Sequence, residues 1–313
     1  MGTPDFAVAS LKALVDNRFN VVAVVTTPDK PAGRGQQVHE SAVKKYAVQN
    51  GLKVLQPEKL KDEHFVKELR ELNADLQLVV AFRMLPEVIW NMPPLGTYNL
   101  HASLLPKYRG AAPINWALIN GETESGVTTF KLKHEIDTGN ILFFEKVKIS
   151  ETMSAGELHD ALMEKGAELI LKTVSTIEQS NANGEELSFL EQDNSQACHA
   201  PKIFKETCRI DWNNPVKEIH NFVRGLSPYP AAHTGLLNTN NALQVVKIFV
   251  VGTTAETHNG ANGLIVTDNK SYLKVLCSDG LIEVKELQLE GKRRMGIAEF
   301  LRGYVIKEGA VFI

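Results

Sequence analysis

At 313 residues and 34.6 kDa the chain is long for one globular domain, which favours two domains. Its 43% hydrophobic and 23% charged residues are typical of a globular protein, and its apolar runs are too short to predict a membrane span. The formal charge of -3 excludes a uniformly basic coat for nucleic acid but permits a local basic patch.

The first residues, MGTPDFAVASLKALV, have no basic stretch ahead of an apolar core and no small-residue cleavage site, so we expect a cytoplasmic protein. The three cysteines, Cys198, Cys208 and Cys277, fit neither a disulfide framework nor a CxxC site. We therefore expect buried thiols.

Helical and strand-like segments alternate in the first half of the chain, as in an α/β domain with a largely parallel sheet. Apolar spacing predicts a helix over residues 6–15, and NVVAVVT predicts a buried strand. ESAVKKYAVQN predicts a second helix, which Gly51 caps in the left-handed conformation. A strand at KVLQP, an amphipathic helix over residues 58–72 and a strand at DLQLVVAF follow.

The next strand ends in YNLH, and residues 126–149 predict two strands around a tight turn at 137–139. Residues 154–179 fit one long helix that closes the first domain. The following segment is polar and nearly aperiodic, which is linker composition. Beyond it, a helix over residues 216–226 and four short alternating runs predict a small antiparallel barrel. We predict domains over residues 1–182 and 203–313, joined by a linker over 183–202.

Asn99 and His101 lie two residues apart at the end of a predicted strand, so both point to one face while Leu100 points to the other. The carboxyl ends of strands in open α/β sheets border the ligand crevice, which favours a functional pair. The alternative is that both side chains only satisfy backbone groups of the loop. The loop that follows, SLLPKYRGAAP, contains Gly110 and two alanines, which permit a flat ligand to approach the main chain.

Asp137 lies in the predicted turn between two strands. Aspartate commonly makes such turns locally, so a structural role alone explains it. A carboxylate beside His101 would instead orient the ring and stabilise an imidazolium. Sequence spacing does not establish that contact.

Several segments in order resemble the methionyl-tRNA formyltransferase family over essentially the whole chain, among them MGTPDFA, TTPDKPAGRG, NLHASLLPKYRGAAPINWAL, IDTGNIL and LEGKRRMGIAEFLRG. The N-x-H-x-S-L-L-P core is shared with other formyltransferases that use 10-formyltetrahydrofolate, such as those acting on glycinamide ribonucleotide or sugars. The KPAGRG loop and the C-terminal domain point to the tRNA branch. The resemblance implies a Rossmann-like catalytic domain, an OB-like barrel that binds tRNA, and formylation of methionyl initiator tRNA for translation initiation.

By this resemblance Asn99, His101 and Asp137 are catalytic. Asn99 would donate to the oxyanion of the tetrahedral adduct, His101 would donate or act as general acid, and Asp137 would hold His101 and accept the proton of the amine. Ser103 would form a hydrogen bond within the loop and would not act as a nucleophile. The folate is expected to lie between two loops, formed by Phe82, Arg83, Met84, Leu85, Ser103, Leu104, Leu105 and Pro106. Core packing is the alternative for Leu85 and Leu104.

Two basic groups are expected to bind tRNA. Lys30 and Arg34 belong to a flexible loop, and the second group lies in or beside the barrel: Lys202, Lys205, Arg209, Lys247, Lys285, Lys292, Arg293 and Arg294. Solvated surface is the alternative for both groups. The sequence has neither an HExxH motif nor a Cys/His cluster, so we expect no metal. We also expect a monomer that does not bind membranes.

Two rival functions stay open at this point. One is formylation of another amine, such as a nucleotide sugar or glycinamide ribotide, which the C-terminal domain disfavours. The other is a non-catalytic RNA-binding protein on an α/β scaffold, for which Asn99→Ala and His101→Ala would leave function intact.

One departure from the family concerns the first strand. In the family an apolar strand leads into MGTPDFA, whereas here Met1 stands where that strand would be ending. Because a missing central strand leaves backbone groups unpaired, we expect a longer natural chain, in which the upstream residues raise both melting temperature and activity. Thermal unfolding of the two forms tests this expectation, and equal stability would contradict it.

Overall fold

The computed structural model describes residues 1–32, 37–238 and 243–313, and the chain divides into two compact units. Unit 1 comprises Met1–Gly110, Glu124–Lys148 and His159–His199, and unit 2 comprises Ala111–Thr123, Ile149–Leu158 and Ala200–Ile313. These units differ from the predicted domains in two ways. Two short segments from the first half of the chain group with unit 2, and most of the predicted linker groups with unit 1.

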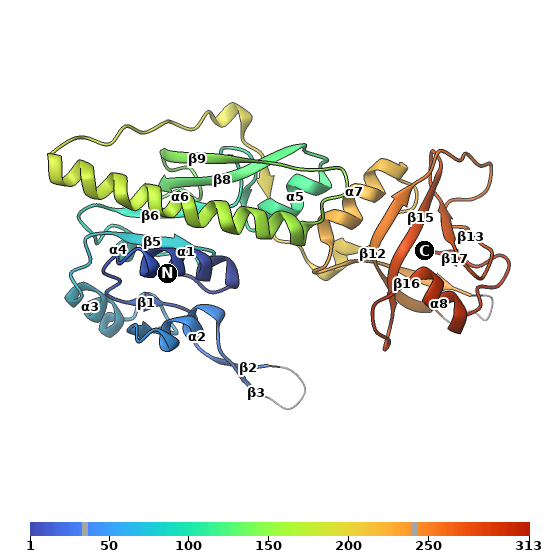
Figure 1. Ribbon diagram of the computed structural model, residues 1–313, viewed down its shortest axis with the longest axis horizontal. Coiled ribbons are helices and arrows are strands. Elements are labelled where there is room, and N and C mark those ends of the chain that lie inside the picture. Colours follow the sequence, from blue (N-terminus) through green and yellow to red (C-terminus); the bar gives the residue numbers. More distant parts are fainter. Residues whose placement is uncertain (33–36, 239–242) are drawn as a thin grey trace. The chain divides into compact units, whose positions relative to one another are not determined.

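Unit 1 is the α/β domain (Figure 1). Its elements are α1 (Asp5–Asp16), β1 (Val24–Val25), β2 (Lys30–Ala32), β3 (Gln37–His39), α2 (Ala42–Gln49), β4 (Val54–Leu55), α3 (Glu63–Glu71), β5 (Gln77–Val80), α4 (Glu87–Trp90), β6 (Thr97–His101), β7 (Arg109–Gly110), β8 (Glu124–Lys131), β9 (Ile141–Lys148) and most of α6 (Ala155–Asn183). β1 pairs with β4, and β5 pairs with β6, both in parallel. β8 then pairs antiparallel with β6 and with β9. The predicted Rossmann-like fold is confirmed, with a sheet that changes from parallel to antiparallel at β6.

Local capping sets where two of the helices begin or end. Ser41 caps α2 by accepting a hydrogen bond from the Lys44 backbone N–H, and Gly51 follows this helix with φ of 67°, as predicted. α3 begins later than the sequence pattern indicates, because the Asp62 carboxylate accepts the Phe65 N–H at 3.1 Å and so fixes the first turn.

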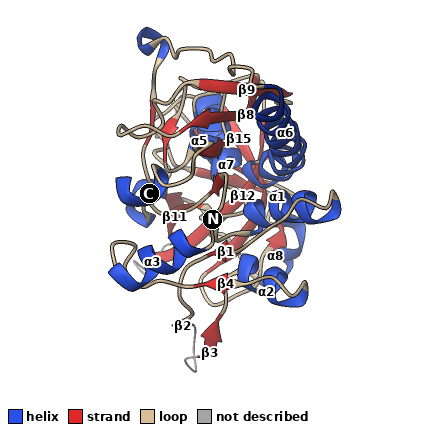
Figure 2. Cartoon of the chain, turned by 90° about the vertical axis from the view of Figure 1, so that its left-hand side faces the viewer, coloured by secondary structure: helices blue, strands red, loops and turns tan. Residues whose placement is uncertain are grey.

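The long helix α6 covers one face of the antiparallel part of the sheet, beside β8 and β9 (Figure 2). Gly166 lies so close to β6 that a Cβ there would be 2.8 Å from Leu100 Cδ2. The hydroxyls of Thr173 on the helix and Thr129 on β8 are 2.9 Å apart and share a hydrogen bond. Leu100 therefore faces α6, and the alternating side chains Asn99 and His101 face the opposite side of the sheet.

Met1 and Gly2 connect the two parts of the sheet. The Gly2 N–H donates to the Val25 carbonyl at 3.0 Å, and the Val80 N–H donates to the Met1 carbonyl at 2.9 Å. A cavity of about 500 Å³ lies beside them, lined mainly by apolar residues of β1, β5, α1 and α6. Burial lowers the pKa of the Met1 amine to about 5. This cavity lies between β1 and β5, where we expected a further central strand.

The predicted linker is partly docked on unit 1. Leu190 exchanges two backbone hydrogen bonds with Ile141, the first residue of β9. The Phe189 ring stacks on Tyr98 with centroids 6.5 Å apart. Residues 189–192 thus run along the antiparallel edge of the sheet, although their composition resembles a free connection.

Unit 2 is the barrel, with β10 (His199–Ala200) at its boundary. Its elements are α5 (Pro113–Ile119), α7 (Val216–Leu226), β11 (Ala232–Leu237), β12 (Leu243–Thr253), β13 (Ile265–Thr267), β14 (Leu273–Leu276), β15 (Leu281–Leu289), β16 (Met295–Gly296), α8 (Ile297–Gly303) and β17 (Val311–Phe312). The strands follow the order β13-β14-β15-β12-β11-β17, and a bridge between Leu264 and Val311 nearly closes the barrel. Four of these strands and α7 were predicted, whereas β11 and β17 were not.

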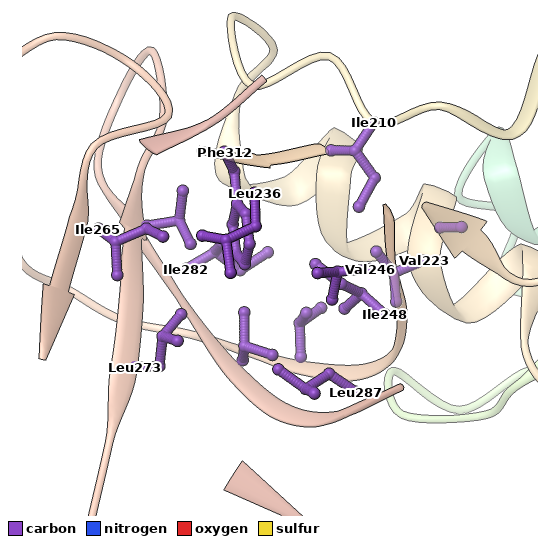
Figure 3. Close-up of a cluster of buried hydrophobic side chains, with 14 of the residues drawn as sticks. Ile210, Val223, Leu236, Val246, Ile248, Ile265, Leu273, Ile282, Leu287 and Phe312 are labelled. Atoms are coloured by element: carbon purple, nitrogen blue, oxygen red, sulfur yellow. The ribbon is translucent and has the colours of Figure 1, made fainter. Parts of the chain in front are cut away.

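The core of unit 2 is formed by aliphatic residues of the strands and of α7 and α8, together with Trp212, Phe300 and Phe312; part of this cluster is shown in Figure 3. Two of the three free cysteines, Cys208 and Cys277, are buried as expected, and burial raises the pKa of the Cys277 thiol to about 12. Cys198 is only half-buried, because it lies in the segment docked on unit 1. Within the described residues, none of the helices has the length and apolar character needed to cross a membrane.

Candidate active site

His101 is the last residue of β6 and is 7% exposed. Its Nε2 lies 2.8 Å from the carbonyl oxygen of Tyr108. Because a carbonyl only accepts hydrogen bonds, Nε2 must carry a proton. The other ring nitrogen, Nδ1, lies 3.9 Å from Asp137 Oδ2, too far for a hydrogen bond but close enough for charge interaction. Nδ1 is thus the ring nitrogen that faces the carboxylate.

Asp137 reaches this position by an indirect route. β8 runs antiparallel to β6, so it ends beside the first residues of β6, and Leu132 donates its backbone N–H to Thr97. The connection from β8 to β9 must therefore fold back along the sheet to place Asp137 beside His101 at the far end of β6. Asp137 adopts φ of 55° in this connection, a left-handed conformation that aspartate tolerates better than most residues.

The Asp137 carboxylate is held by main chain. Its Oδ2 accepts the Gly110 backbone N–H at 3.0 Å, and the side chain is 9% exposed. Gly139 passes against β8 so closely that a Cβ there would be 1.8 Å from the Lys131 carbonyl oxygen. The loop after β6 thus holds both groups, since Tyr108 accepts from His101 and Gly110 donates to Asp137.

Asn99 shares the face of His101. Its backbone lies between Val79 of β5 and Phe130 of β8 in the sheet, and its side chain is half-buried. Within the described part of the chain the Asn99 amide makes no hydrogen bond. Its donor group is therefore available to a ligand on this face.

The loop of residues 103–106 is supported from β8. Thr128 donates its hydroxyl to the Ser103 carbonyl at 2.7 Å and accepts the Leu105 N–H at 3.2 Å. The Ser103 hydroxyl donates to the Lys107 carbonyl at 2.6 Å, the loop hydrogen bond expected of it. Leu105 is buried in a core cluster, so its packing role is evident. Leu104 is half-buried and rests on Gly126 of β8.

The loop of residues 82–85 leaves the same edge of the sheet, because β5 and β6 are parallel neighbours with Val80 opposite Leu100. Leu85 packs in the core, which agrees with core packing, the alternative given for this residue. Arg83 donates to the carbonyls of Pro57 and Glu58, so its guanidinium holds the loop to the preceding segment. Met84, 71% exposed, is the residue of this loop most open to a ligand.

One member of the first basic group, Lys30, lies on the β2–β3 hairpin. Lys30 is exposed at its start, and Arg34 lies outside the described residues. The base of the hairpin is anchored through Asp29, which forms an ion pair with Lys44 and accepts the Gln56 amide at 2.8 Å. These hydrogen bonds, that of Lys44 first, hold the pKa of Asp29 below its ordinary value.

The second basic group is brought together only in part. Lys202 and Lys205 line a cavity of about 700 Å³ in unit 2, and Lys292 is not among the residues that line it. Arg293 and Arg294 instead form ion pairs with Glu299 and Glu286. Arg209 is exposed beside His233, which also lines the cavity.

Lys247, a member of the second basic group, also lines the cavity of unit 2. Sequence reasoning missed several other residues at these sites. His233 and Tyr229 line the same cavity, and Tyr229 is 83% exposed. Burial lowers the pKa of His233, and the charges of nearby Lys205, Arg209 and Lys247 lower it further, so the cavity is electropositive. In unit 1, Tyr108 and Gly110 act through their backbones, which give no signal in a pattern of side chains.

Residues 1–174 match a known domain described as "Formyl transferase". Residues 202–305 match the "Formyl transferase, C-terminal domain". The chain belongs to the formyl transferase family. Two curated relatives are a methionyl-tRNA formyltransferase of Bacteroides fragilis, 55% identical over 98% of this chain and 95% of that protein, and one of Parabacteroides distasonis, 57% identical over 97% and 94%.

Solved structures of the family share the fold. One is a sugar 3N-formyl transferase crystallised in the presence of dTDP and 5-N-formyl-THF, with a TM-score of 0.65 and 23% identity over 93% of this chain and 97% of that chain. A second is an N-formyltransferase of Helicobacter canadensis in complex with folinic acid and dTDP-3-aminofucose, with a TM-score of 0.65 and 24% identity over 90% and 96%. At this identity the likeness establishes the fold alone.

The described residues contain no cluster of three or more His, Cys, Asp or Glu side chains arranged to hold a metal ion. The polar side chains at the end of β6 include those of Asn99, His101 and Asp137.

The charge of Asp137 is open to a direct test. Asp137→Asn keeps an oxygen that can accept the Gly110 N–H but removes the negative charge beside His101 Nδ1. We expect formyl-transfer kcat to fall by about 10²- to 10⁴-fold, the range of general acid–base contributions, with little change in melting temperature. Steady-state kinetics measure this, with Asp16→Asn on the exposed end of α1 as control. A kcat equal to that of the wild type would exclude a role for this charge.

Proposed function

We propose that the chain transfers the formyl group of 10-formyltetrahydrofolate to the α-amino group of methionyl initiator tRNA. The identity of 55–57% to proteins of that name, over nearly their full length, supports the choice of acceptor. The observation that carries the chemistry is the convergence of Asn99, His101 and Asp137 on one face at the end of β6.

In this reaction the amine nitrogen bonds to the formyl carbon, the bond from that carbon to folate N10 breaks, the amine loses a proton and N10 gains one. The tetrahedral adduct carries an oxyanion, and the unpaired amide of Asn99 would donate to it. His101 has Nε2 bound to Tyr108, so it would act on the substrate through Nδ1. Asp137 Oδ2 lies 3.9 Å from His101 Nδ1. Beside this nitrogen, Asp137 would accept the proton that the amine loses.

The folate would lie along the edge where the loops after β5 and β6 leave the sheet. Met84 and Leu104 are the side chains with exposed surface there, while Leu85 and Leu105 support the loops from the core. The structural relatives solved with folate derivatives are consistent with this co-substrate.

The tRNA would contact both basic groups. Lys30 lies on the hairpin anchored by Asp29, Arg34 follows it four positions later in the sequence, and the cavity of unit 2 is lined by Lys202, Lys205 and Lys247. Cations beside an exposed tyrosine suit a nucleic acid, since they bind phosphates while the ring stacks on an unpaired base.

The first test is transfer of labelled formyl from 10-formyltetrahydrofolate to methionyl initiator tRNA, compared with nucleotide sugars and glycinamide ribotide as acceptors. Asn99→Ala and His101→Ala should each lower kcat by several orders of magnitude while tRNA affinity barely changes, because both side chains act only on the transition state. Faster transfer to a small amine would replace the proposed acceptor. Full transfer activity in both variants would exclude the proposed catalytic roles of Asn99 and His101, and a wild type that binds tRNA but transfers formyl to no acceptor would point to a non-catalytic RNA-binding protein.

The basic groups predict the opposite pattern. Arg34→Ala, and separately Lys202→Ala with Lys205→Ala, should weaken tRNA binding and flatten the dependence of log Kd on log salt by about one ion for each phosphate that the variant no longer binds. Lys165→Ala serves as a control, because Lys165 is an exposed lysine on α6 that pairs with Glu168 and lies outside both basic groups. Binding measured between low and moderate salt decides this, and an unchanged slope would make the residues ordinary solvated surface.

A further inference from the structure

Gln192 contacts the turn that carries Asp137. Its Nε2 donates to the Asp137 carbonyl at 2.9 Å and to the Gly139 carbonyl at 2.7 Å. The backbone pairing of Leu190 with Ile141 brings Gln192 to this place. Both hydrogens of the amide are therefore used on the backbone of one turn.

The oxygen of the same amide faces the other loop of the site. Gln192 Oε1 accepts from Arg109 Nε at 3.0 Å and from Arg109 Nη2 at 2.6 Å. Arg109 Nη2 also donates to Asn194 Oδ1 at 2.8 Å. Because carbonyls only accept and a guanidinium only donates, the contacts permit a single orientation of the amide.

Arg109 lies between the two residues that hold the catalytic groups. Tyr108 accepts the hydrogen bond of His101, and Gly110 donates to Asp137. The pair Gln192–Arg109 therefore ties the loop after β6 to the turn before β9, which are the two segments that must meet for the site to form.

We propose that Gln192 is a positioning residue that holds Asp137 in register with His101 through Arg109. This inference rests on the proposed function for its catalytic consequence. The left-handed φ of 55° at Asp137 disfavours the turn in isolation, so external contacts must keep it in place. A displacement of about 1 Å at a reacting group is enough to lower a rate by about a hundredfold.

Two substitutions separate the roles of the amide. Gln192→Ala removes both contacts, whereas Gln192→Glu keeps an acceptor for Arg109 but places an anion against two carbonyl oxygens. Both should lower kcat by about 10- to 100-fold and leave KM for folate and tRNA within about twofold. Gln196→Ala is a matched control, because Gln196 is exposed and bonds only to Asp193 among the described residues. Its kcat should equal that of the wild type.

A double-mutant cycle distinguishes positioning from general support of the fold. If Gln192 acts through Asp137, Gln192→Ala should lower kcat by a much smaller factor in the Asp137→Asn variant than in the wild type. Fully multiplicative effects, a loss confined to KM, or wild-type kcat in Gln192→Ala would each overturn the proposal.

A readout without catalysis completes the test. The Gly110 N–H is bonded to Asp137, so its hydrogen exchange, measured by NMR, should accelerate in Gln192→Ala and stay unchanged in Gln196→Ala. Unchanged exchange at Gly110 in Gln192→Ala would contradict the proposal even if the wild type formylates no tRNA. Failure of the wild type to formylate tRNA, with accelerated exchange in Gln192→Ala, would reject the proposed function and keep the positioning role of Gln192.

Discussion

The hydrogen bond from the Gly110 N–H to Asp137 Oδ2 is the constraint on which the site depends. It joins a loop that follows β6 to a connection that starts at the opposite end of β6, and it fixes the carboxylate 3.9 Å from His101. A carboxylate in such a place is stable only when hydrogen-bond donors compensate for its lost hydration. A backbone N–H provides such a hydrogen bond without the loss of conformational entropy that ordering a second side chain would require. The chemistry of unit 1 thus relies on main-chain geometry as much as on side chains.

The change of strand direction at β6 explains how these segments come together. Its parallel neighbour β5 delivers the 82–85 loop to the same edge as the 103–106 loop. Its antiparallel neighbour β8 carries the chain away from that edge, so the β8–β9 connection has to return along the sheet. A wholly parallel sheet would place that connection elsewhere. The segment beyond α6 then covers the returning connection and binds it.

Local patterns predicted the parts of the site that depend on local geometry. The two-residue period of a strand placed Asn99 and His101 on one face, and α7 was predicted with its observed bounds of 216–226. The contacts of Asp137 were beyond such patterns because they join residues 27 to 55 positions apart in the chain. Gln192 was assigned to a linker because polar composition does not distinguish solvated residues from residues that hydrogen-bond to a distant turn. β11 was missed because alanine and glycine among its residues weaken the alternation that its buried positions show.

Gly126 of β8 lies against Leu104 of the 103–106 loop and limits how this loop packs on the sheet. A Cβ there would be 2.5 Å from Leu104 Cδ2 and 2.2 Å from the Glu145 carbonyl oxygen of β9. Because the side chain of Gly126 is only a hydrogen atom, β8 and β9 can keep their observed spacing, and Leu104 can pack closely against β8 below the proposed folate. The width of the proposed donor site is therefore set by the sheet, so an enzyme engineer who wanted to admit a bulkier one-carbon donor there would have to rebuild strands as well as exchange loop residues.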